Sequence, residues 1–272
     1  MSVPFVSELA AALATIEARD GAIKKARRLC ASALADPSEN AIAQAAWLER
    51  HSGVTLPQPS RRNEIESNEA NAWAASAGAE WGKAVAEAQR WQDEQPFSGR
   101  PAIFGGYVAS TALEQFEISE SMYRQGLLTN RHDATLYNNL AFALAKQDKA
   151  EDAQAVLEQG LCLELSAPQR ICLTATRGLI EFRKNRPRNG RLLYQEAIRS
   201  ALQHSQDLLA HLAKIHCAIE ELRIGSQQAA AREREAREAV DKLRGPYRPV
   251  FREKLRRAAS NWGNMRQKEE GQ

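Results

Sequence analysis

The sequence is poor in several features that would point to a particular class of protein. Aromatic residues make up only 6% of its 272 residues, which disfavours a β-sandwich built on aromatic and β-branched residues. The sequence also lacks a large excess of charge of either sign, because its 37 Lys and Arg residues nearly balance its 34 Asp and Glu residues and the formal net charge is only +3. Such a small net charge does not by itself imply nucleic-acid binding. The remaining composition, ordinary in hydrophobicity and rich in alanine, favours helices.

Cysteines and long apolar runs are scarce as well. The four cysteines include no CxxC pair, so neither a zinc site nor a dense disulfide framework is expected. We interpret them as thiols in a reducing compartment: Cys30, Cys162, Cys172 and Cys217. No run of 18 apolar residues exists, so no membrane span is predicted. The first 20 residues lack the basic start of a secretory signal, and Glu8 interrupts their apolar part. The expected compartment is therefore the cytoplasm.

No arrangement of residues in the sequence indicates catalysis. The stretch FGGY at 104–107 lacks the lysine of a phosphate-binding loop, and a close contact between helices is the better interpretation. His211 and His216 are five residues apart, so they do not share a helical face as paired metal ligands would. We predict a non-enzymatic protein with no catalytic residues, no metal and no cofactor.

One spacing of small and large residues does recur. In YNNLAFALAKQDKAEDAQAVLEQGL, at 137–161, the trio Ala153, Leu157 and Gly160 is small, large and small. The same order occurs 34 residues earlier and 37 residues later, in Ser119, Tyr123 and Gly126 and in Gly190, Tyr194 and Ala197. Small residues let two antiparallel helices approach closely, while the large one fills the space beside the crossing.

Each trio follows another helical run and a polar break. The first helices of the units are expected at 102–114, 134–146 and 171–184. The breaks after them are EQFE, KQDKAED and KNRPRN, and Pro187 in the last suits the start of a helix. The extra residues before the third unit are assigned to the connection at 167–169. Each unit is thus helix, turn, helix in about 34 residues.

This pattern resembles the tetratricopeptide repeat (TPR), whose period is 34 residues. The resemblance is best over 100–204, and within it the copy at 134–167 matches most closely. Four residues of that copy stand where the family favours Trp, Leu, Gly and Tyr: Tyr137, Leu140, Ala141 and Leu144. The resemblance implies an all-α protein, an α-solenoid of stacked antiparallel helix hairpins, and brings no catalytic residues with it.

The sequence also predicts how the chain is organised. Five segments are expected: an N-terminal helical hairpin at 1–52, with a degenerate repeat as the alternative, a linker or long loop at 53–64, TPR-like repeats at 65–205, capping helices at 206–244 and a basic amphipathic tail at 245–272. The individual repeats are expected at 65–98, a weak copy, and at 100–133, 134–167 and 171–204. Capping is expected because the last hairpin of a stack would otherwise expose an apolar face.

The TPR resemblance places the first helix of each unit on the concave side of the solenoid. Exposed positions there combine aromatic residues with two adjacent amides, which suits an extended peptide or a partner helix. The predicted partner-binding residues are Trp73, Phe104, Val108, Asn138, Asn139, Phe142 and Phe182. Each of them has an alternative role in the core between repeats. The leading hypothesis is a protein-protein interaction scaffold or adaptor that binds a protein or peptide, with a second copy of the chain as a further candidate partner.

The tail at 245–272 supports an alternative function. An apolar stripe that includes Phe251 and Leu255 lies opposite a basic face. The candidate basic surface is Arg252, Lys254, Arg256 and Arg257. Such a helix could bind nucleic acid, an anionic surface or an acidic partner, so the alternative is a nucleic-acid-binding or regulatory subunit of a larger complex. A closing helix whose arginines only keep the end soluble is the other interpretation.

Overall fold

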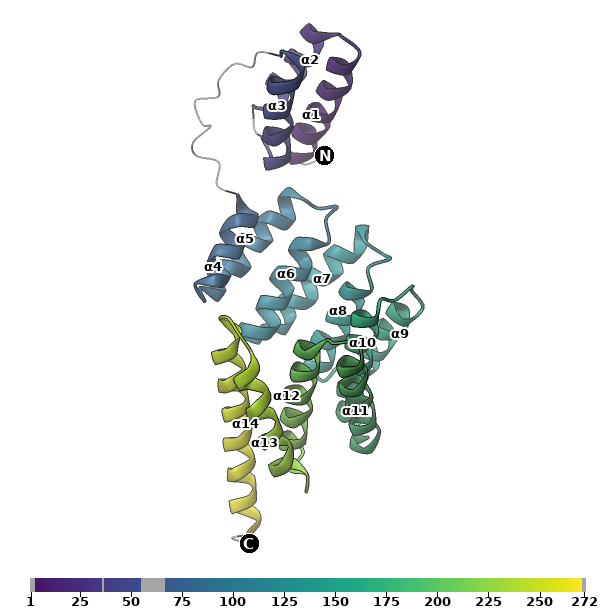
Figure 1. Ribbon diagram of the computed structural model, residues 1–272, viewed down its shortest axis with the longest axis vertical. Helices are drawn as coiled ribbons and strands as arrows, with labels where there is room; N and C mark the ends of the chain where they lie inside the picture. The colour runs from purple at the N-terminus through teal and green to yellow at the C-terminus, as the bar shows by residue number, and fades with distance from the viewer. Residues whose placement is uncertain (1–2, 36, 55–66, 271–272) are drawn as a thin grey trace. The chain divides into compact units, whose positions relative to one another are not determined.

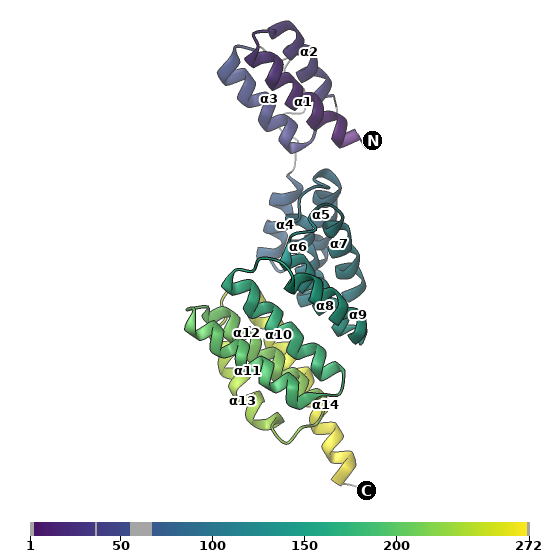
Figure 2. The ribbon, with the colours of Figure 1, turned by 90° about the vertical axis from the view of Figure 1, so that its right-hand side faces the viewer.

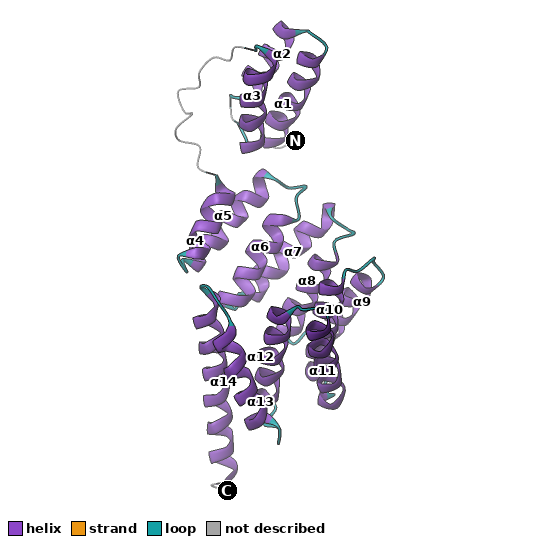
Figure 3. Ribbon diagram, viewed as in Figure 1, coloured by secondary structure: helices purple, strands orange, loops and turns teal. Residues whose placement is uncertain are grey.

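The computed structural model describes residues 3–35, 37–54 and 67–270. All regular structure in these ranges is helical (Figure 3), which confirms the expected all-α class. The chain divides into two compact units, Met1–Ala70 and Asn71–Gln272. Most of the predicted linker at 53–64 lies outside the described residues. None of the helices in the described ranges combines the length and the apolar character needed to cross a bilayer.

The first unit contains three helices where a hairpin was expected. They are α1 (Val3–Arg19), α2 (Ile23–Ala33) and α3 (Glu39–Ser52). Helices α1 and α2 form the hairpin, and α3 packs against α1. Ala26 and Cys30 of α2 are buried in the core together with Leu48 of α3. The third helix therefore covers the apolar face that a two-helix hairpin would leave open.

The second unit is a succession of helix hairpins followed by one long helix (Figure 1). Its helices are α4 (Asn68–Ala77), α5 (Trp81–Glu94), α6 (Arg100–Val108), α7 (Phe116–Thr129), α8 (Ala134–Lys146), α9 (Ala150–Leu161), α10 (Ala167–Arg183), α11 (Pro187–Gln203), α12 (Asp207–Arg223), α13 (Ala229–Lys242) and α14 (Tyr247–Glu270). A π-helical turn, η1 (Ala109–Leu113), extends α6. Consecutive helices from α5 to α13 contact one another, and Figure 2 shows α10 to α13 lying side by side.

One type of turn closes five of these helices: α4, α8, α10, α11 and α12. A residue in the left-handed region follows the end of each of them: Ala79, Asp148, Asn185, Ser205 and Gly225. The following residue donates its N–H to the carbonyl five residues earlier: Glu80 to Ala75, Lys149 to Leu144, Arg186 to Glu181, Gln206 to Ala201 and Ser226 to Glu221. This is the Schellman motif, which satisfies carbonyls that a helix end leaves without partners. Its recurrence explains why each connection is short and turns the chain sharply.

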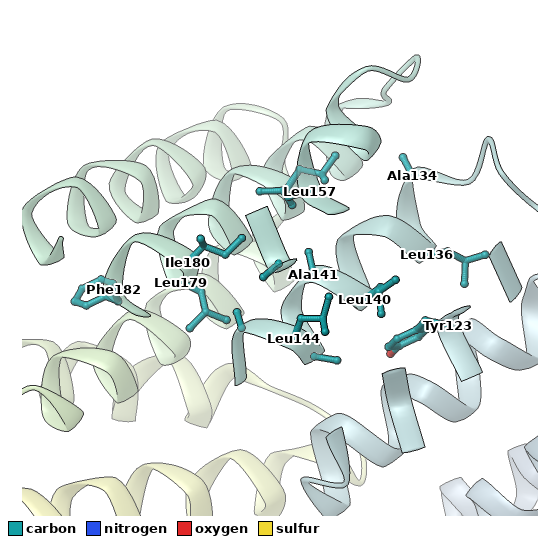
Figure 4. Close-up of a cluster of buried hydrophobic side chains, with 14 of the residues drawn as sticks. Tyr123, Ala134, Leu136, Leu140, Ala141, Leu144, Leu157, Leu179, Ile180 and Phe182 are labelled. Carbon is teal, nitrogen blue, oxygen red and sulfur yellow. The ribbon is translucent and has the colours of Figure 1, made fainter. Parts of the chain in front are cut away.

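The small residues of the recurring trios lie where helices touch, as the spacing predicts. Ala153 and Ala197 are fully buried. A Cβ built on Gly160 would lie 2.9 Å from the Cβ of Tyr137, and one on Gly190 would lie 2.9 Å from the carbonyl oxygen of Gly178. Real Cβ atoms do not approach so closely, so these crossings require glycine. The large side chains beside them, such as Leu157, fill the core that Figure 4 shows between α8, α9 and α10.

The FGGY stretch has the role expected of it. Gly105 and Gly106 lie in α6 and are buried. A Cβ on Gly105 would lie 2.6 Å from the Cβ of Ala88, and Gly106 faces the ring of Tyr123. The two glycines therefore let α6 approach both α5 and α7.

Two helix boundaries differ from those predicted. Helix α10 begins at Ala167, four residues before the expected start at 171, because Ser166 caps it. The Ser166 hydroxyl accepts a hydrogen bond from the backbone N–H of Gln169, and the Gln169 side chain accepts one from the backbone N–H of Ser166. This capping box makes 167–169 the first turn of the helix and not part of the connection. The run expected at 102–114 is α6 followed by η1, which shifts from α-helical to π-helical at Ala109.

The predicted basic tail is a packed helix. Helix α14 lies beside α12 and α13 (Figure 1). It also contacts η1. Phe251 and Leu255 are 2% and 3% exposed. At the start of α14 the ring of Tyr247 lies 4.9 Å from that of Trp81 and 5.3 Å from that of Tyr107, between centroids. The start of α14 is thus anchored on the first hairpins of the second unit.

Candidate functional site

Three of the seven predicted partner-binding residues line one cavity. Asn138, Asn139 and Phe142 project from α8 into a space of about 210 Å³ that η1, α10 and α12 also border. Leu140 and Leu144 of the same helix point the other way and are buried in the core. The 3.6-residue period of the helix separates the two faces. We call this space the amide cavity.

Hydrogen bonds hold the two amides in place. The Thr176 hydroxyl donates to the Asn138 Oδ1 at 2.8 Å, and the Asn138 Nδ2 donates to the Asn139 Oδ1 at 3.0 Å. An asparagine amide can make up to four hydrogen bonds, and the described contacts use two of those of Asn138. The remaining capacity faces a cavity lined mainly by apolar atoms. The site can therefore bond a peptide backbone and accept an apolar side chain.

The wall of the amide cavity nearest α14 is aromatic. The His216 ring lies edge to face between Phe142, at 5.3 Å, and Phe251, at 5.7 Å, measured between centroids. Burial, reinforced by the nearby cations Lys146 and Lys254, lowers the pKa of His216 to about 3. The imidazole is therefore neutral at physiological pH and acts as part of the apolar wall.

The other four predicted residues do not join the amide cavity. Phe104 and Val108 are 9% and 0% exposed and belong to the core of the first hairpins. Phe182 is fully buried against Tyr194, with ring centroids 6.1 Å apart. These three were expected on an exposed face, but neighbouring helices cover them. Trp73 is 53% exposed, and its ring lies on Phe104, 4.3 Å away between centroids.

A second cavity, of about 400 Å³, shares Phe142 and His216 with the first. We call it the basic cavity, because its charged lining consists of five cations and one carboxylate: Lys146, Arg183, Arg223, Lys254, Arg257 and Glu114. These side chains come from α8, α10, α12, α14 and the turn after η1. No sequence motif could bring them together.

A buried carboxylate, that of Glu220, forms ion pairs with three of the five cations of the basic cavity. Glu220 of α12 is 1% exposed, and it accepts hydrogen bonds from Lys146 Nζ at 3.2 Å, Arg183 Nη2 at 2.9 Å and Arg223 Nε at 2.8 Å. Burial alone would raise the pKa of Glu220, but the three cations lower it to about 2. Glu220 is therefore ionised under all ordinary conditions. The Nε of Arg183 is buried without a hydrogen-bond partner among the described residues.

Glu114 pairs with the other two cations of the basic cavity, Lys254 and Arg257. Its carboxylate lies 3.2 Å from Lys254 Nζ and 2.8 Å from Arg257 Nη2. The Lys254 side chain is only 10% exposed. The pKa of Lys254 is lowered to about 8, chiefly by burial. The neighbouring cations Lys146 and Arg257 act in the same direction, and Glu114 opposes them. Lys254 was expected on an exposed basic face, and the structure instead turns it inward.

The remaining residues of the predicted basic surface are exposed and paired. Arg252 donates to Asp241 at 3.0 Å, and Arg256 makes two hydrogen bonds of 2.7 Å with Glu253. Arg257, half exposed, belongs to the basic cavity as described. The four residues therefore do not form one open cationic face.

Sequence reasoning missed Lys146, His216 and Arg223 as site residues. Lys146 does carry a signal, because it lies four and seven residues after Phe142 and Asn139 on the same helical face. His216 and Arg223 come from α12, where nothing local marks them. Within the described residues no group of three or more His, Cys, Asp or Glu is placed to hold a metal ion.

Comparison with protein-family models found no match, and comparison with curated proteins found none either.

Proposed function

We propose that this chain is a non-enzymatic scaffold or adaptor that binds an extended peptide, or an extended segment of a partner protein, in the amide cavity. The observation that carries the proposal is the convergence of Asn138, Asn139 and Phe142 on one open cavity. Main-chain hydrogen bonds to amides and an apolar pocket for one anchor side chain are the usual elements of peptide recognition.

The hairpin architecture supports a TPR-like solenoid as the framework. The first four hairpins of the second unit begin at residues 68, 100, 134 and 167, close to the 34-residue period of that repeat. The same turn recurs in the first, third and fourth of these hairpins, and glycines lie at helix crossings in the second, third and fourth. Repeats of this kind present a row of first helices to a ligand. The amide cavity lies on one of these first helices, α8.

The size of the amide cavity favours a side chain as its occupant. Pockets for drug-sized molecules usually measure about 300–1,000 Å³, and this one measures about 210 Å³. A single apolar side chain suits that volume better than a cofactor does. The four cysteines are free, and we retain the cytoplasm as the compartment in which the scaffold acts.

The alternative of a nucleic-acid-binding subunit has less support. Arg252 and Arg256 are engaged by Asp241 and Glu253, and Lys254 is buried. A phosphate backbone would need several of these cations on one open face. A binding titration with DNA and RNA at two salt concentrations distinguishes the alternatives, since phosphate contacts make the affinity fall steeply with salt. The double variant Arg252→Gln, Arg256→Gln serves as the control, because truncating α14 would expose Phe251.

The proposal is tested by selecting binders from a random peptide library against the purified protein. The affinity of a selected, fluorescently labelled peptide is then measured by anisotropy. Phe142→Ala and Asn138→Ala should each weaken binding about tenfold, since a buried anchor contact contributes more than about 1 kcal/mol. Phe97→Ala, which removes a phenylalanine that is 63% exposed, is the matched control and should bind as the wild type does.

Two outcomes contradict the proposal. One is a library selection that yields no binder at all. The other is a binder whose affinity is unchanged in Phe142→Ala and Asn138→Ala while thermal melts show both variants folded. Loss of binding in Asn189→Ala instead would place the peptide in a different groove, between α9 and α11, where Asn189 lies.

A further inference from the structure

The two cavities follow one another along the same helices. On α8, Asn138 and Asn139 face the amide cavity, Phe142 lies in the shared wall, and Lys146 faces the basic cavity. On α12 the sequence Leu212, His216, Arg223 runs in the same way from the first cavity through the wall to the second. Because both helices contribute a continuous face, one extended ligand could lie along the pair of cavities.

Charge in the basic cavity is not balanced by the protein. Five cationic side chains line it, and the buried or half-buried carboxylates that contact them are Glu220 and Glu114. Two more exposed carboxylates contact them from outside: Asp148 lies 2.6 Å from Arg183, and Glu253 lies 4.0 Å from Arg257. With all four carboxylates counted, the five cations still leave an excess of positive charge, and Glu253 is shared with Arg256. Cations gathered in a partly enclosed space repel one another, and an anionic ligand relieves that repulsion.

Two further observations indicate that an anion belongs there. The Arg183 side chain is 7% exposed, lines the cavity, and leaves its Nε–H without a partner in the described part of the chain. A buried donor of this kind costs free energy unless something accepts its hydrogen bond. The lowered pKa of Lys254 has burial as its main cause, and Lys146 and Arg257 add to it. An anion in the cavity would supply the missing opposite charge.

We propose that the basic cavity binds an acidic group, the carboxylate or phosphate of a side chain in the same peptide whose apolar side chain occupies the amide cavity. This inference rests on the proposed peptide-binding function and specifies the class of partner: an acidic peptide with an apolar anchor. Glu114 is the internal competitor, since its carboxylate already occupies Lys254 and Arg257.

The geometry of α8 fixes the spacing of the two groups. Asn139 and Lys146 are seven residues apart, which corresponds to about 10 Å along an α-helix. An extended peptide rises about 3.3 Å per residue. The acidic residue should therefore lie about three positions from the apolar anchor, always on the same side of it.

The first experiment uses the peptide library and one selected peptide. The selected sequences should be enriched in acidic residues about three positions from an apolar one. One selected peptide is synthesised with Glu, Gln or phosphoserine at that position, and anisotropy gives the three affinities. We expect the Gln form to bind about tenfold more weakly than the better of the two charged forms, as for loss of a charge-assisted hydrogen bond. The ranking of Glu and phosphoserine identifies which acidic group the cavity prefers.

The second experiment uses charge variants of the protein with the same peptides. Arg257→Gln should weaken binding of the charged peptide about tenfold and leave the Gln peptide unchanged. Arg256→Gln is the matched control: it is the adjacent arginine of α14, it is 65% exposed and its partner is Glu253. Glu114→Gln should act in the opposite direction and strengthen binding of the charged peptide, because it removes the internal competitor.

The outcomes separate the two proposals. If peptides are selected but the Glu, phosphoserine and Gln forms bind equally, or if Arg257→Gln and Arg256→Gln behave alike, the basic cavity does not bind the acidic group and peptide binding in the amide cavity stands. If no peptide is selected, the proposed function fails and this inference fails with it. Lys254→Gln, checked by a thermal melt, provides an independent second variant inside the cavity.

Discussion

The two cavities along α8 are maintained by different forces. The amide cavity is walled by apolar side chains and by a short chain of neutral hydrogen bonds from Thr176 through Asn138 to Asn139. The basic cavity is built around ionised groups, with Glu220 buried among three cations. Neutral hydrogen bonds and apolar contacts respond little to salt and pH, whereas buried charges depend on each of their partners. The structure of the amide cavity should therefore change little with salt and pH, whereas that of the basic cavity should be sensitive to the loss of any one of its charges.

The largest expected effect concerns the centre of the basic cavity. Glu220→Gln leaves Lys146, Arg183 and Arg223 without their common counter-ion in a buried place. Breaking a buried ion pair from one side costs about 3–5 kcal/mol of unfolding free energy. Denaturant unfolding of this variant and of Glu253→Gln, an exposed carboxylate paired with Arg256, measures the difference, and the unfolding free energy of the control should change much less, because solvent screens its ion pair. Equal effects would mean that Glu220 is not the organising charge.

The next effect tests the apolar packing behind the amide cavity. Leu157 is 1% exposed in the core shared by α8, α9 and α10. Leu157→Ala should cost about 2–5 kcal/mol, the usual range for a buried leucine truncated to alanine. Because no charge is involved, the loss should be the same at low and at high salt. Leu202→Ala, at a leucine that is 53% exposed, is the matched control, and a melt without loss in Leu157→Ala would place that side chain outside the core.

Acid should affect the wall that the two cavities share. The pKa of His216 is lowered from 6.5 to about 3 by burial and by neighbouring cations. The unfolded chain therefore takes up a proton on this residue at a higher pH than the folded chain does, and stability falls as the pH decreases below about 6.5. Between pH 6.5 and 4.5 the loss should be about 2 kcal/mol. Below pH 4.5 Glu220, whose pKa is lowered to about 2, adds a second loss of the same sign.

A variant separates the two acid effects. His216→Leu removes the ionisable ring from the wall, so its unfolding free energy should stay nearly constant between pH 6.5 and 4.5 and then decrease with that of the wild type. Urea titrations at a series of pH values provide the measurement. Parallel curves for the two proteins across the whole range would show that His216 does not titrate differently in the folded state.

The smallest expected effect lies away from both cavities. Ala79 has a φ of 58° in the turn between α4 and α5, a conformation that a side chain disfavours. Ala79→Gly should raise the unfolding free energy by about 0.5 kcal/mol, because the relief of strain exceeds the added freedom of the unfolded chain. Peptide affinity should not change. A loss of stability in the melt would mean that the turn does not hold Ala79 in the left-handed region.

The fold was predictable where the sequence repeats itself. The bounds of α8, 134–146, follow from its apolar period and from the polar break after it, and the structure confirms them. Gly160 and Gly190 lie at helix crossings as their spacing indicates. The start of α10 was missed, because the run of Ala167, Pro168 and Gln169 looks like a connection until Ser166 is recognised as its cap. The cap at Ser166 thus decides where α10 begins, and the start at residue 167 keeps the spacing of the hairpins close to 34 residues.

Only the part of the site that a single helix contributes could be predicted from the sequence. Asn138, Asn139 and Phe142 are neighbours on α8, so the sequence alone places them together. Phe182 was misplaced because an apolar residue on a first helix can face either a ligand or the next hairpin, and its burial depends on α11 and α12. The basic cavity was not predictable for the same reason, since its charges come from distant segments that only the tertiary packing of α14 against α12 and η1 brings together.

The contact between the two ends of the second unit has a consequence for cooperativity. In linear repeat arrays each unit touches only its neighbours, so such arrays can lose structure from one end in steps. Here Tyr247 is in contact with Trp81 and Tyr107 and lies 3.5 Å from the hydroxyl of Ser76, 171 residues away in the chain. The last helix thus works as a clasp that joins the tail of the array to its head. Fraying from either end must open this clasp first, so the whole array should melt as a single body, and a partner that pulled α14 away would loosen every hairpin behind it.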